Sequence, residues 1–281
     1  MQQTSEAAHR LRARTFTCMG TVVSLTVPTD AHKAPQAAAD ELEAATAVVE
    51  RLFTELDSIF SLYRPDSEAS VLLRGELALP EASAEMRARY EEAAEWRLLT
   101  EGAFTPERPD GALDLSGIVK GHAIREAGMS LLALSMVNWC LNAGGDVLVS
   151  GSPNPGTDVP WRAGIVDPTD RRTLLAGFPL GGAALGSLPP GEKTADGGTR
   201  AALATSGSAE RGDHIWGVTA RAAEFRQVSV AAADVVTADV LATAIVAGGV
   251  PMLNRATAMW DIEALAVRAN GELLATGGFR R

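Results

Sequence analysis

The sequence has 281 residues, 46% of them hydrophobic, which is enough chain to bury the core of one large domain or two small ones. Its 25 basic and 35 acidic residues give a formal net charge of −10. This balance argues against a nucleic-acid-binding surface, which needs clustered Lys and Arg, so an anionic ligand must be held locally by a metal ion, backbone amides or individual cations.

The cysteines and the N-terminus narrow the class of protein further. Cys18 and Cys140 are too few for a disulfide framework or a cysteine-based zinc site, and two buried free thiols are favoured. No stretch is uninterruptedly apolar over the roughly 18 residues that span a membrane, and residues 1–14 lack the apolar core of a signal peptide. We therefore expect no stable membrane insertion, a cytoplasmic location, a flexible N-terminus over residues 1–14 and one domain over residues 15–281.

The first part of the chain predicts a strand followed by two helices. Residues 15–27 are apolar or alternate with β-branched Thr and Val, which is typical of a strand. Over residues 36–60 apolar positions recur near a 3.6-residue period, which predicts a long amphipathic helix. A second helix is predicted over residues 83–100, with Gly102 as its cap.

The rest of the chain predicts short strands separated by two helices. The helices are expected over residues 124–134 and 234–246, the second with Asp234 as its N-cap and Gly248-Gly249 as its stop. The expected strands cover residues 137–141, 147–149, 161–166, 173–180, 201–205, 225–230, 262–267 and 273–276. Strands without regular βα alternation predict an α+β fold, with antiparallel sheets flanked by helices, rather than a doubly wound sheet.

Two segments carry the residue types of a metal and phosphate site. On the predicted helix, Asp239 and Thr243 are four residues apart and can direct two oxygens at one point, and oxygen ligands suit Mg²⁺. The segment from Asp114 to Gly121 offers a carboxylate, a flexible glycine at Gly117 and the ammonium of Lys120. Taken alone, the Asp239 and Thr243 pair is more often an ordinary solvated helix face, because this spacing is common by accident, whereas the Asp114 segment is equally compatible with a glycine-rich helix start.

Other common sites are not indicated. The turn over residues 142–146 is not a dinucleotide-binding loop, and no phosphate-binding loop with the sequence G-x-x-x-x-G-K-[ST] occurs. The four histidines lack zinc spacing, and no nucleophile elbow supports a Ser-His-Asp triad. His214 could contact a ligand, although a structural role is as compatible with its sequence.

Several further short segments accompany these two in a fixed order. They are Met19-Gly20-Thr21, Ser61-Leu62-Tyr63, Gly102-Ala103-Phe104, Asn142 to Asp146, Thr205-Ser206-Gly207 and His214-Ile215. Together with the Asp114 and Asp239 segments, this order resembles the ApbE family, the FAD:protein FMN transferases. The resemblance implies an ApbE-like, T-fold-related domain.

The resemblance also implies a reaction and its ligands. Enzymes of this family bind FAD and Mg²⁺, cleave the pyrophosphate and attach FMN through a phosphoester bond to a Thr or Ser hydroxyl of a target flavoprotein, releasing AMP. In family terms, Mg²⁺ would be bound by an oxygen at Gly117 and by the side chains of Asp239 and Thr243. The FAD site would be lined by Met19, Tyr63, Ala103, Phe104, Thr105, Asp114, Lys120, His214 and Ile215.

Catalytic roles follow from the charge that develops in such a reaction. Lys120 and the metal would stabilise the leaving AMP, and Asp114 or Asp239 would be candidates to take the proton of the acceptor hydroxyl.

Thr105 stands where the family usually has Asp, and the connection from Thr105 to Asp114 is shorter than usual. Three alternatives therefore stay open: an FAD-binding protein without transferase activity, an FAD pyrophosphatase that gives FMN and AMP, and a chain whose similar segments only shape a core.

Overall fold

The computed structural model describes residues 10–29, 33–181, 200–207 and 224–280. Within these ranges, one antiparallel sheet has eight strands in the order β1-β2-β3-β4-β7-β8-β9-β10, and β5 pairs with β6 in a second sheet. The strands are β1 (Leu11–Cys18), β2 (Thr21–Pro28), β3 (Trp139–Ala143), β4 (Asp146–Ser150), β5 (Trp161–Val166), β6 (Leu174–Leu180), β7 (Ala202–Gly207), β8 (Phe225–Ala232), β9 (Glu263–Arg268) and β10 (Leu273–Ala275).

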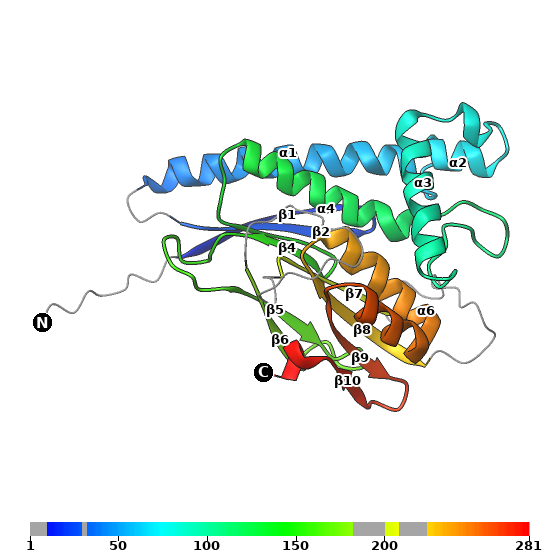
Figure 1. The fold of residues 1–281 in the computed structure, drawn as a ribbon. Helices are drawn as coiled ribbons and strands as arrows, with labels where there is room; N and C mark the ends of the chain where they lie inside the picture. The colour runs from blue at the N-terminus through cyan, green and yellow to red at the C-terminus, as the bar shows by residue number, and fades with distance from the viewer. Residues whose placement is uncertain (1–9, 30–32, 182–199, 208–223, 281) are drawn as a thin grey trace, which may run out of the picture.

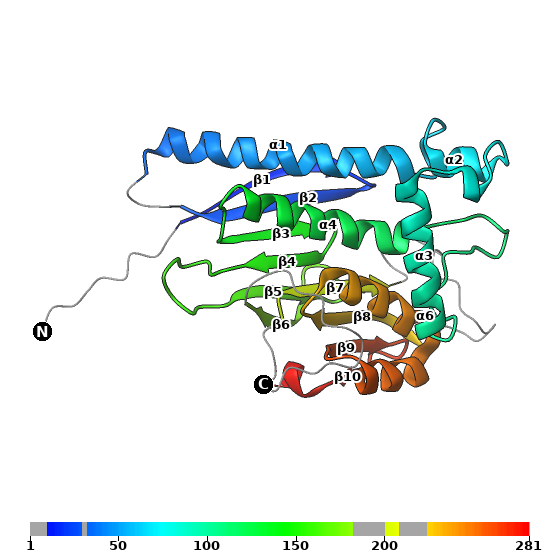
Figure 2. The ribbon, with the colours of Figure 1, turned by 45° about the horizontal axis from the view of Figure 1, so that its top comes forward.

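Helices cover one face of the large sheet, and the β5–β6 pair lies against the other (Figures 1 and 2). The helices are α1 (Pro35–Phe60), α2 (Glu68–Leu73), α3 (Ala84–Leu99), α4 (Ser116–Ala133) and α6 (Val235–Met259), with the 3₁₀ turns η1 (Leu79–Glu81) and η2 (Gly277–Arg280). The observed architecture confirms the predicted α+β class with antiparallel sheets flanked by helices.

The two faces of the sheet belong to two apolar cores because side chains alternate along each strand. Leu148 of β4 and Ala204 of β7 join the large core beneath α1, α4 and α6. Their neighbours Val147 and Leu203 point the other way, into a smaller core with Trp161 of β5. On β4 and β7, the even-numbered residues therefore face the helices and the odd-numbered residues face the β5–β6 pair.

The start of the chain differs from the prediction of one strand. β1 and β2 form a hairpin whose register runs from Leu11 opposite Pro28 to Cys18 opposite Thr21. Met19 and Gly20 make the turn with φ of 50° and 69°, in the left-handed region that a tight hairpin turn requires. Since β1 begins at Leu11, residues 11–14 belong to the sheet and not to a flexible N-terminus.

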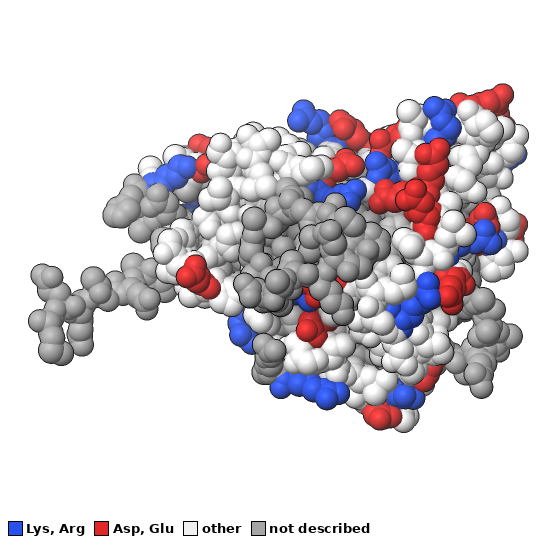
Figure 3. Space-filling view, viewed as in Figure 1, with Lys and Arg blue, Asp and Glu red and all other residues white. Residues whose placement is uncertain are grey.

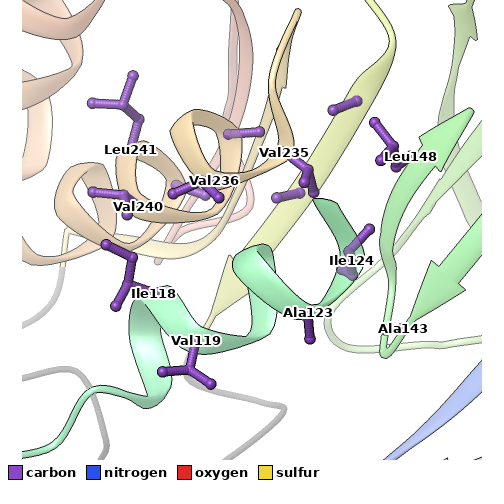
Figure 4. Close-up of a cluster of buried hydrophobic side chains, with 14 of the residues drawn as sticks. Ile118, Val119, Ala123, Ile124, Ala143, Leu148, Val235, Val236, Val240 and Leu241 are labelled. Carbon is purple, nitrogen blue, oxygen red and sulfur yellow. The ribbon is translucent and has the colours of Figure 1, made fainter. Parts of the chain in front are cut away.

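The helix predicted over residues 124–134 begins much earlier, at Ser116. Gly117, Lys120 and Gly121 therefore lie inside α4 and form no turn before it. A Cβ atom at Gly121 would lie 3.0 Å from the Cα atom of Val236, so this glycine permits close contact between α4 and α6. Figure 4 shows Ile118 of α4 and Val240 of α6 in the space between the two helices.

α6 is longer than predicted and is broken where its stop was expected. Asp234 is the N-cap, and its side chain accepts the Thr237 N–H at 2.9 Å. Gly249 has φ 64° and ψ −154°, and helical structure then resumes to Met259. The Glu224 carboxylate accepts the Val250 N–H at 3.1 Å and so satisfies a donor that the break exposes.

By length and hydropathy, α6 is the one helix of the described ranges that could cross a membrane. In this fold 67% of its apolar window is buried inside the protein, as expected of a core helix.

On the face drawn in Figure 3, basic and acidic side chains are interspersed rather than gathered by sign.

Candidate functional site

Asp239 and Thr243 lie one turn apart on the first half of α6, as predicted. Most of the remaining residues of this half-helix are buried and apolar, and Asp239 itself is only 2% exposed. Burying an ionised carboxylate in such surroundings is costly unless charged or hydrogen-bonding groups accompany it. The position therefore needs polar partners from neighbouring elements.

Lys120 of α4 and Asp146 of β4 supply such partners. The Lys120 ammonium lies 2.5 Å from Asp146 Oδ2 and 3.5 Å from Asp239 Oδ1. Asp146 has no exposed surface, and the Lys120 side chain is 11% exposed. Asp146 precedes Leu148 by two residues on β4, so its side chain lies on the face of the sheet that the helices cover.

The end of β7 completes the group of polar side chains. Asp146 Oδ1 accepts the backbone N–H of Thr205 at 3.0 Å, and the Ser206 hydroxyl lies 2.9 Å from that of Thr243. Lys120, Asp146, Ser206, Asp239 and Thr243 thus converge from α4, β4, β7 and α6, and we call them the buried polar cluster. On the opposite face of the sheet, the hydroxyls of Thr205 and Ser229 pair at 2.8 Å.

The donor set suits a hard cation. It offers carboxylate and hydroxyl oxygens, which Mg²⁺ prefers, and Mg²⁺ typically takes only one or two protein carboxylates. Among the described residues, no three His, Cys, Asp or Glu side chains gather as a metal site, so the softer, multi-ligand sites of zinc are not indicated there. Gly117, the predicted backbone ligand, lies one turn before Lys120 on α4, and its role in metal binding stays a prediction.

The predicted flavin-contacting residues that the structure describes lie in three connections, after β1, α1 and α3, and, for Lys120, in α4. Gly144 N donates to Val22 O at 3.1 Å, so the Met19–Gly20 turn lies beside the turn that precedes Asp146. Ala103 and Phe104 are buried, and a Cβ atom at Gly117 would lie 3.1 Å from the Phe104 ring.

Tyr63 and Thr105 differ in exposure. Tyr63, in the connection after α1, is 86% exposed. Thr105 is partly buried, and its hydroxyl accepts the Glu107 N–H at 3.2 Å. FAD contact by Tyr63 and Thr105 stays a prediction. The Tyr63 side chain is exposed enough for a large ligand to reach it.

Asp114 closes the short connection that leads into α4. Its Oδ1 accepts the Ser116 N–H at 2.9 Å at the start of the helix, and its own N–H donates to Pro106 O at 2.7 Å. The Arg108 N–H donates to Ala112 O at 2.8 Å, so the segment folds back on itself as a tight hairpin. Asp114 therefore has a structural role at the helix start, and its catalytic role stays a prediction.

Two predicted residues and two unpredicted ones complete the account. His214 and Ile215 lie outside the described residues. Asp146 and Ser206 belong to the segments Asn142 to Asp146 and Thr205-Ser206-Gly207, and the sequence pattern predicts no role for either residue. A carboxylate directly before the buried run Val147 to Val149, after two glycines, is the signal that could have singled out Asp146.

The two cysteines are poor nucleophiles. Burial raises the pKa of the Cys140 thiol on β3 to about 12. Burial also raises the pKa of Cys18, with a further contribution from the charge of Asp57. Both thiols therefore stay protonated near neutral pH. Both are free, as predicted, but each is only partly buried rather than buried.

A model of the ApbE family matches residues 19–108 and 105–266 of the chain. The two matches meet at the short hairpin connection between Thr105 and Asp114.

The fold is similar to solved structures over nearly the whole chain. The flavin transferase ApbE from Vibrio cholerae has a TM-score of 0.71 at 22% identity, covering 97% of this chain and 99% of that one. The ApbE protein of Thermotoga maritima has a TM-score of 0.70 at 19% identity, with 96% and 98% coverage. The Pseudomonas stutzeri flavinyl transferase ApbE, in its apo form, has 0.69 at 19% identity, with 96% of each chain covered.

No curated protein sequence is significantly similar to the chain. The family model nevertheless covers well over half of it, and the chain belongs to the ApbE family.

Proposed function

We propose that the protein is a Mg²⁺-dependent FAD:protein FMN transferase. It cleaves the pyrophosphate of FAD, attaches FMN through a phosphoester bond to a Thr or Ser hydroxyl of an acceptor flavoprotein, and releases AMP. The observation that carries the proposal is the buried polar cluster, in which Asp239 and Thr243 present oxygens beside the Lys120 ammonium. Membership of the ApbE family and the fold of the named flavin transferases support it.

The acidic and hydroxyl side chains of the cluster and its lysine would have different roles. Asp239 and Thr243, with the Gly117 carbonyl oxygen, would hold Mg²⁺, which supplies positive charge at the phosphates during transfer. Lys120 adds a second positive charge where the leaving AMP gains negative charge. The Lys120 stem is largely buried between α4 and the sheet, so its ammonium is already oriented before FAD binds.

The transfer balances without any further reactant. A bond forms between the acceptor oxygen and the phosphorus of the FMN half, and the bond from that phosphorus to the bridging oxygen breaks. The electron pair leaves with AMP, and the hydroxyl proton passes to a carboxylate. Asp239 would be a weak base while it holds the cation, so Asp114, whose Oδ1 accepts the Ser116 N–H, stays the other candidate to take the proton.

Mass spectrometry of an acceptor protein tests the proposal. Incubation with FAD and Mg²⁺ should add one FMN to the acceptor and release an equal amount of AMP. Asp239→Asn should abolish both, whereas Asp66→Asn, at an exposed carboxylate, should keep them. The absence of transfer and AMP release with several acceptors would contradict the proposal.

The hairpin between Thr105 and Asp114 favours a second candidate, an FAD-binding protein that transfers nothing. Its chain is closed by hydrogen bonds and is too short to extend far over a flavin. Stoichiometric FAD retention without AMP release would select this function. AMP release at the same rate with and without an acceptor would instead select FAD pyrophosphatase activity.

A further inference from the structure

Lys120 lies between two buried carboxylates but is not shared equally. Its ammonium is 2.5 Å from Asp146 Oδ2 and 3.5 Å from Asp239 Oδ1. Attraction between opposite charges is much stronger in a buried site than in water and rises as the distance shortens. The ammonium is therefore held chiefly by Asp146.

This inequality matters because a cation and an ammonium compete for the same carboxylate oxygens. If Mg²⁺ binds at Asp239 and Thr243, a Lys120 ammonium bound tightly to Asp239 would oppose it by occupation and by repulsion. The lysine stem is flexible, so the position of its ammonium depends on the carboxylates within reach. Without the charge of Asp146, Asp239 is the carboxylate that the ammonium already approaches.

Asp146 is itself fixed in orientation. It has no exposed surface, and its Oδ1 accepts the Thr205 N–H at 3.0 Å, which leaves Oδ2 for Lys120. The same contact ties Asp146 to β7 directly before Ser206, whose hydroxyl is 2.9 Å from that of Thr243. One carboxylate thus connects the ammonium with the strand that supports the hydroxyl donors.

We infer that Asp146 is a positioning residue that holds the Lys120 ammonium on its own side, and thereby leaves the Asp239 carboxylate available to the divalent cation. The inference rests on the proposed function in one respect, the metal site at Asp239 and Thr243. It goes beyond that function by assigning Asp146 a role in metal affinity exerted through Lys120.

Mn²⁺ titration without FAD tests the inference, because Mn²⁺ accepts the oxygen ligands that Mg²⁺ uses and the EPR signal of free Mn²⁺ reports binding directly. Asp146→Asn keeps an oxygen for the Thr205 N–H but loses the charge. It should weaken Mn²⁺ binding by about 10- to 100-fold, the usual effect of removing a residue that orients a metal ligand. Adding Lys120→Met removes the competing ammonium and should return the affinity to within about threefold of wild type.

Two further variants separate this role from a structural one. Ser229→Ala removes a hydroxyl that pairs with Thr205 on the opposite face of the sheet, and it should leave Mn²⁺ affinity unchanged. Lys120→Met alone should bind Mn²⁺ at least as tightly as wild type. Circular dichroism during thermal unfolding confirms that each variant is folded at the temperature of the Mn²⁺ titration.

The outcomes distinguish this inference from the proposed function. Equal Mn²⁺ affinity of wild type and Asp146→Asn would overturn the inference and leave the metal site intact. A double variant as weak as Asp146→Asn, or a weakened Lys120→Met, would overturn it as well. Failure of wild type to bind Mn²⁺ would overturn the metal site of the proposed function and the inference with it.

Discussion

The hydroxyl of Thr243 is the only chemical feature that separates this residue from a valine of nearly the same shape. Thr243 is partly buried and its hydroxyl lies 2.9 Å from that of Ser206, so the side chain has a defined orientation toward β7. A Val side chain would fill the space but leave the Ser206 hydroxyl without this contact and remove one oxygen donor. Thr243→Val therefore tests the role of the hydroxyl oxygen separately from the packing of the side chain.

We expect Thr243→Val to raise the Mg²⁺ concentration that gives half-maximal FMN transfer by about tenfold or more, equivalent to ~1.4 kcal/mol. Thr243→Ser keeps the hydroxyl and should stay within about threefold of wild type. Transfer rates measured across a Mg²⁺ series test this. An equal response of the two variants would show that Thr243 is not a metal ligand.

The half of the buried polar cluster that lies on one helix was predictable from the sequence. Asp239 and Thr243 are four residues apart, and helical geometry alone places them on one face. Asp146 and Ser206 lie on strands separated by dozens of residues, and only the pairing of β4 with β7 brings them together. Local periodicity carries no information about that pairing, so the sequence could mark Asp146 as unusual but could not place it or Ser206 beside Asp239.

The contact between α4 and α6 positions Lys120 opposite Asp239. Gly121 follows Lys120 directly, and a Cβ atom there would lie 3.0 Å from the Val236 Cα atom. A backbone atom cannot move aside as a flexible side chain can, so the helices would have to separate. The same glycine explains why the start of α4 was not predicted. Gly117 and Gly121, four residues apart, indicate a loop when only the local sequence is considered. The contact that requires Gly121 is made with α6, far along the chain.

Gly121→Ala should therefore destabilise the protein although alanine is the better helix former. Helix propensity favours the change by about 1 kcal/mol, and overpacking opposes it by about 1–3 kcal/mol. We expect a net loss of about 1 kcal/mol in urea unfolding. Gly277→Ala, where no atom lies within 4 Å of the added Cβ, is the matched control and should be near neutral. Increased stability of Gly121→Ala would contradict the close contact.

Glu92 ties α3 to α4 through His122, which is fully buried. The Glu92 carboxylate lies 2.8 Å from His122 Nε2. Burial acts to raise the pKa of Glu92, but the hydrogen bond and charge of His122, with the charges of Arg89 and Arg125, outweigh it and lower the pKa below the usual 4.5. A carboxyl whose folded pKa is lowered stabilises the protein above its unfolded pKa, and this is lost as the pH falls through the folded value.

Glu92→Gln should accordingly lower the free energy of unfolding at pH 7 by about 1 kcal/mol. The difference from wild type should shrink as the pH falls below the ordinary carboxyl pKa and should vanish below the lowered folded pKa, where wild-type Glu92 is neutral too. Urea unfolding at several pH values measures it. Glu95→Gln, at an exposed position of α3, should show no such pH dependence. A deficit that stays constant with pH would contradict the ionic role of Glu92.

The layered architecture makes the site a property of the complete fold. The cluster draws on α4 and α6 from the helical layer and on β4 and β7 from the centre of the sheet. The α+β class and most helix positions were predictable because apolar periodicity is local. The strand order and the side of the sheet that Asp146 faces depend on contacts between distant segments, and the sequence pattern did not contain them.

Because the site joins both layers, its ligands should stabilise the fold against complete unfolding. A ligand at about 100 times its dissociation constant adds roughly 2.7 kcal/mol, which for a chain of this size raises Tm by about 5 °C. We expect Mg²⁺ with FAD to raise Tm by about this amount in wild type and in Ser229→Ala, whose changed hydroxyl lies on the opposite face of the sheet. Asp239→Asn should lose most of the rise that depends on Mg²⁺, because its amide is a weak ligand beside the Lys120 charge. Thermal unfolding with FAD alone, Mg²⁺ alone and both together measures these contributions. An equal Mg²⁺-dependent rise in Asp239→Asn would place the cation elsewhere in the protein.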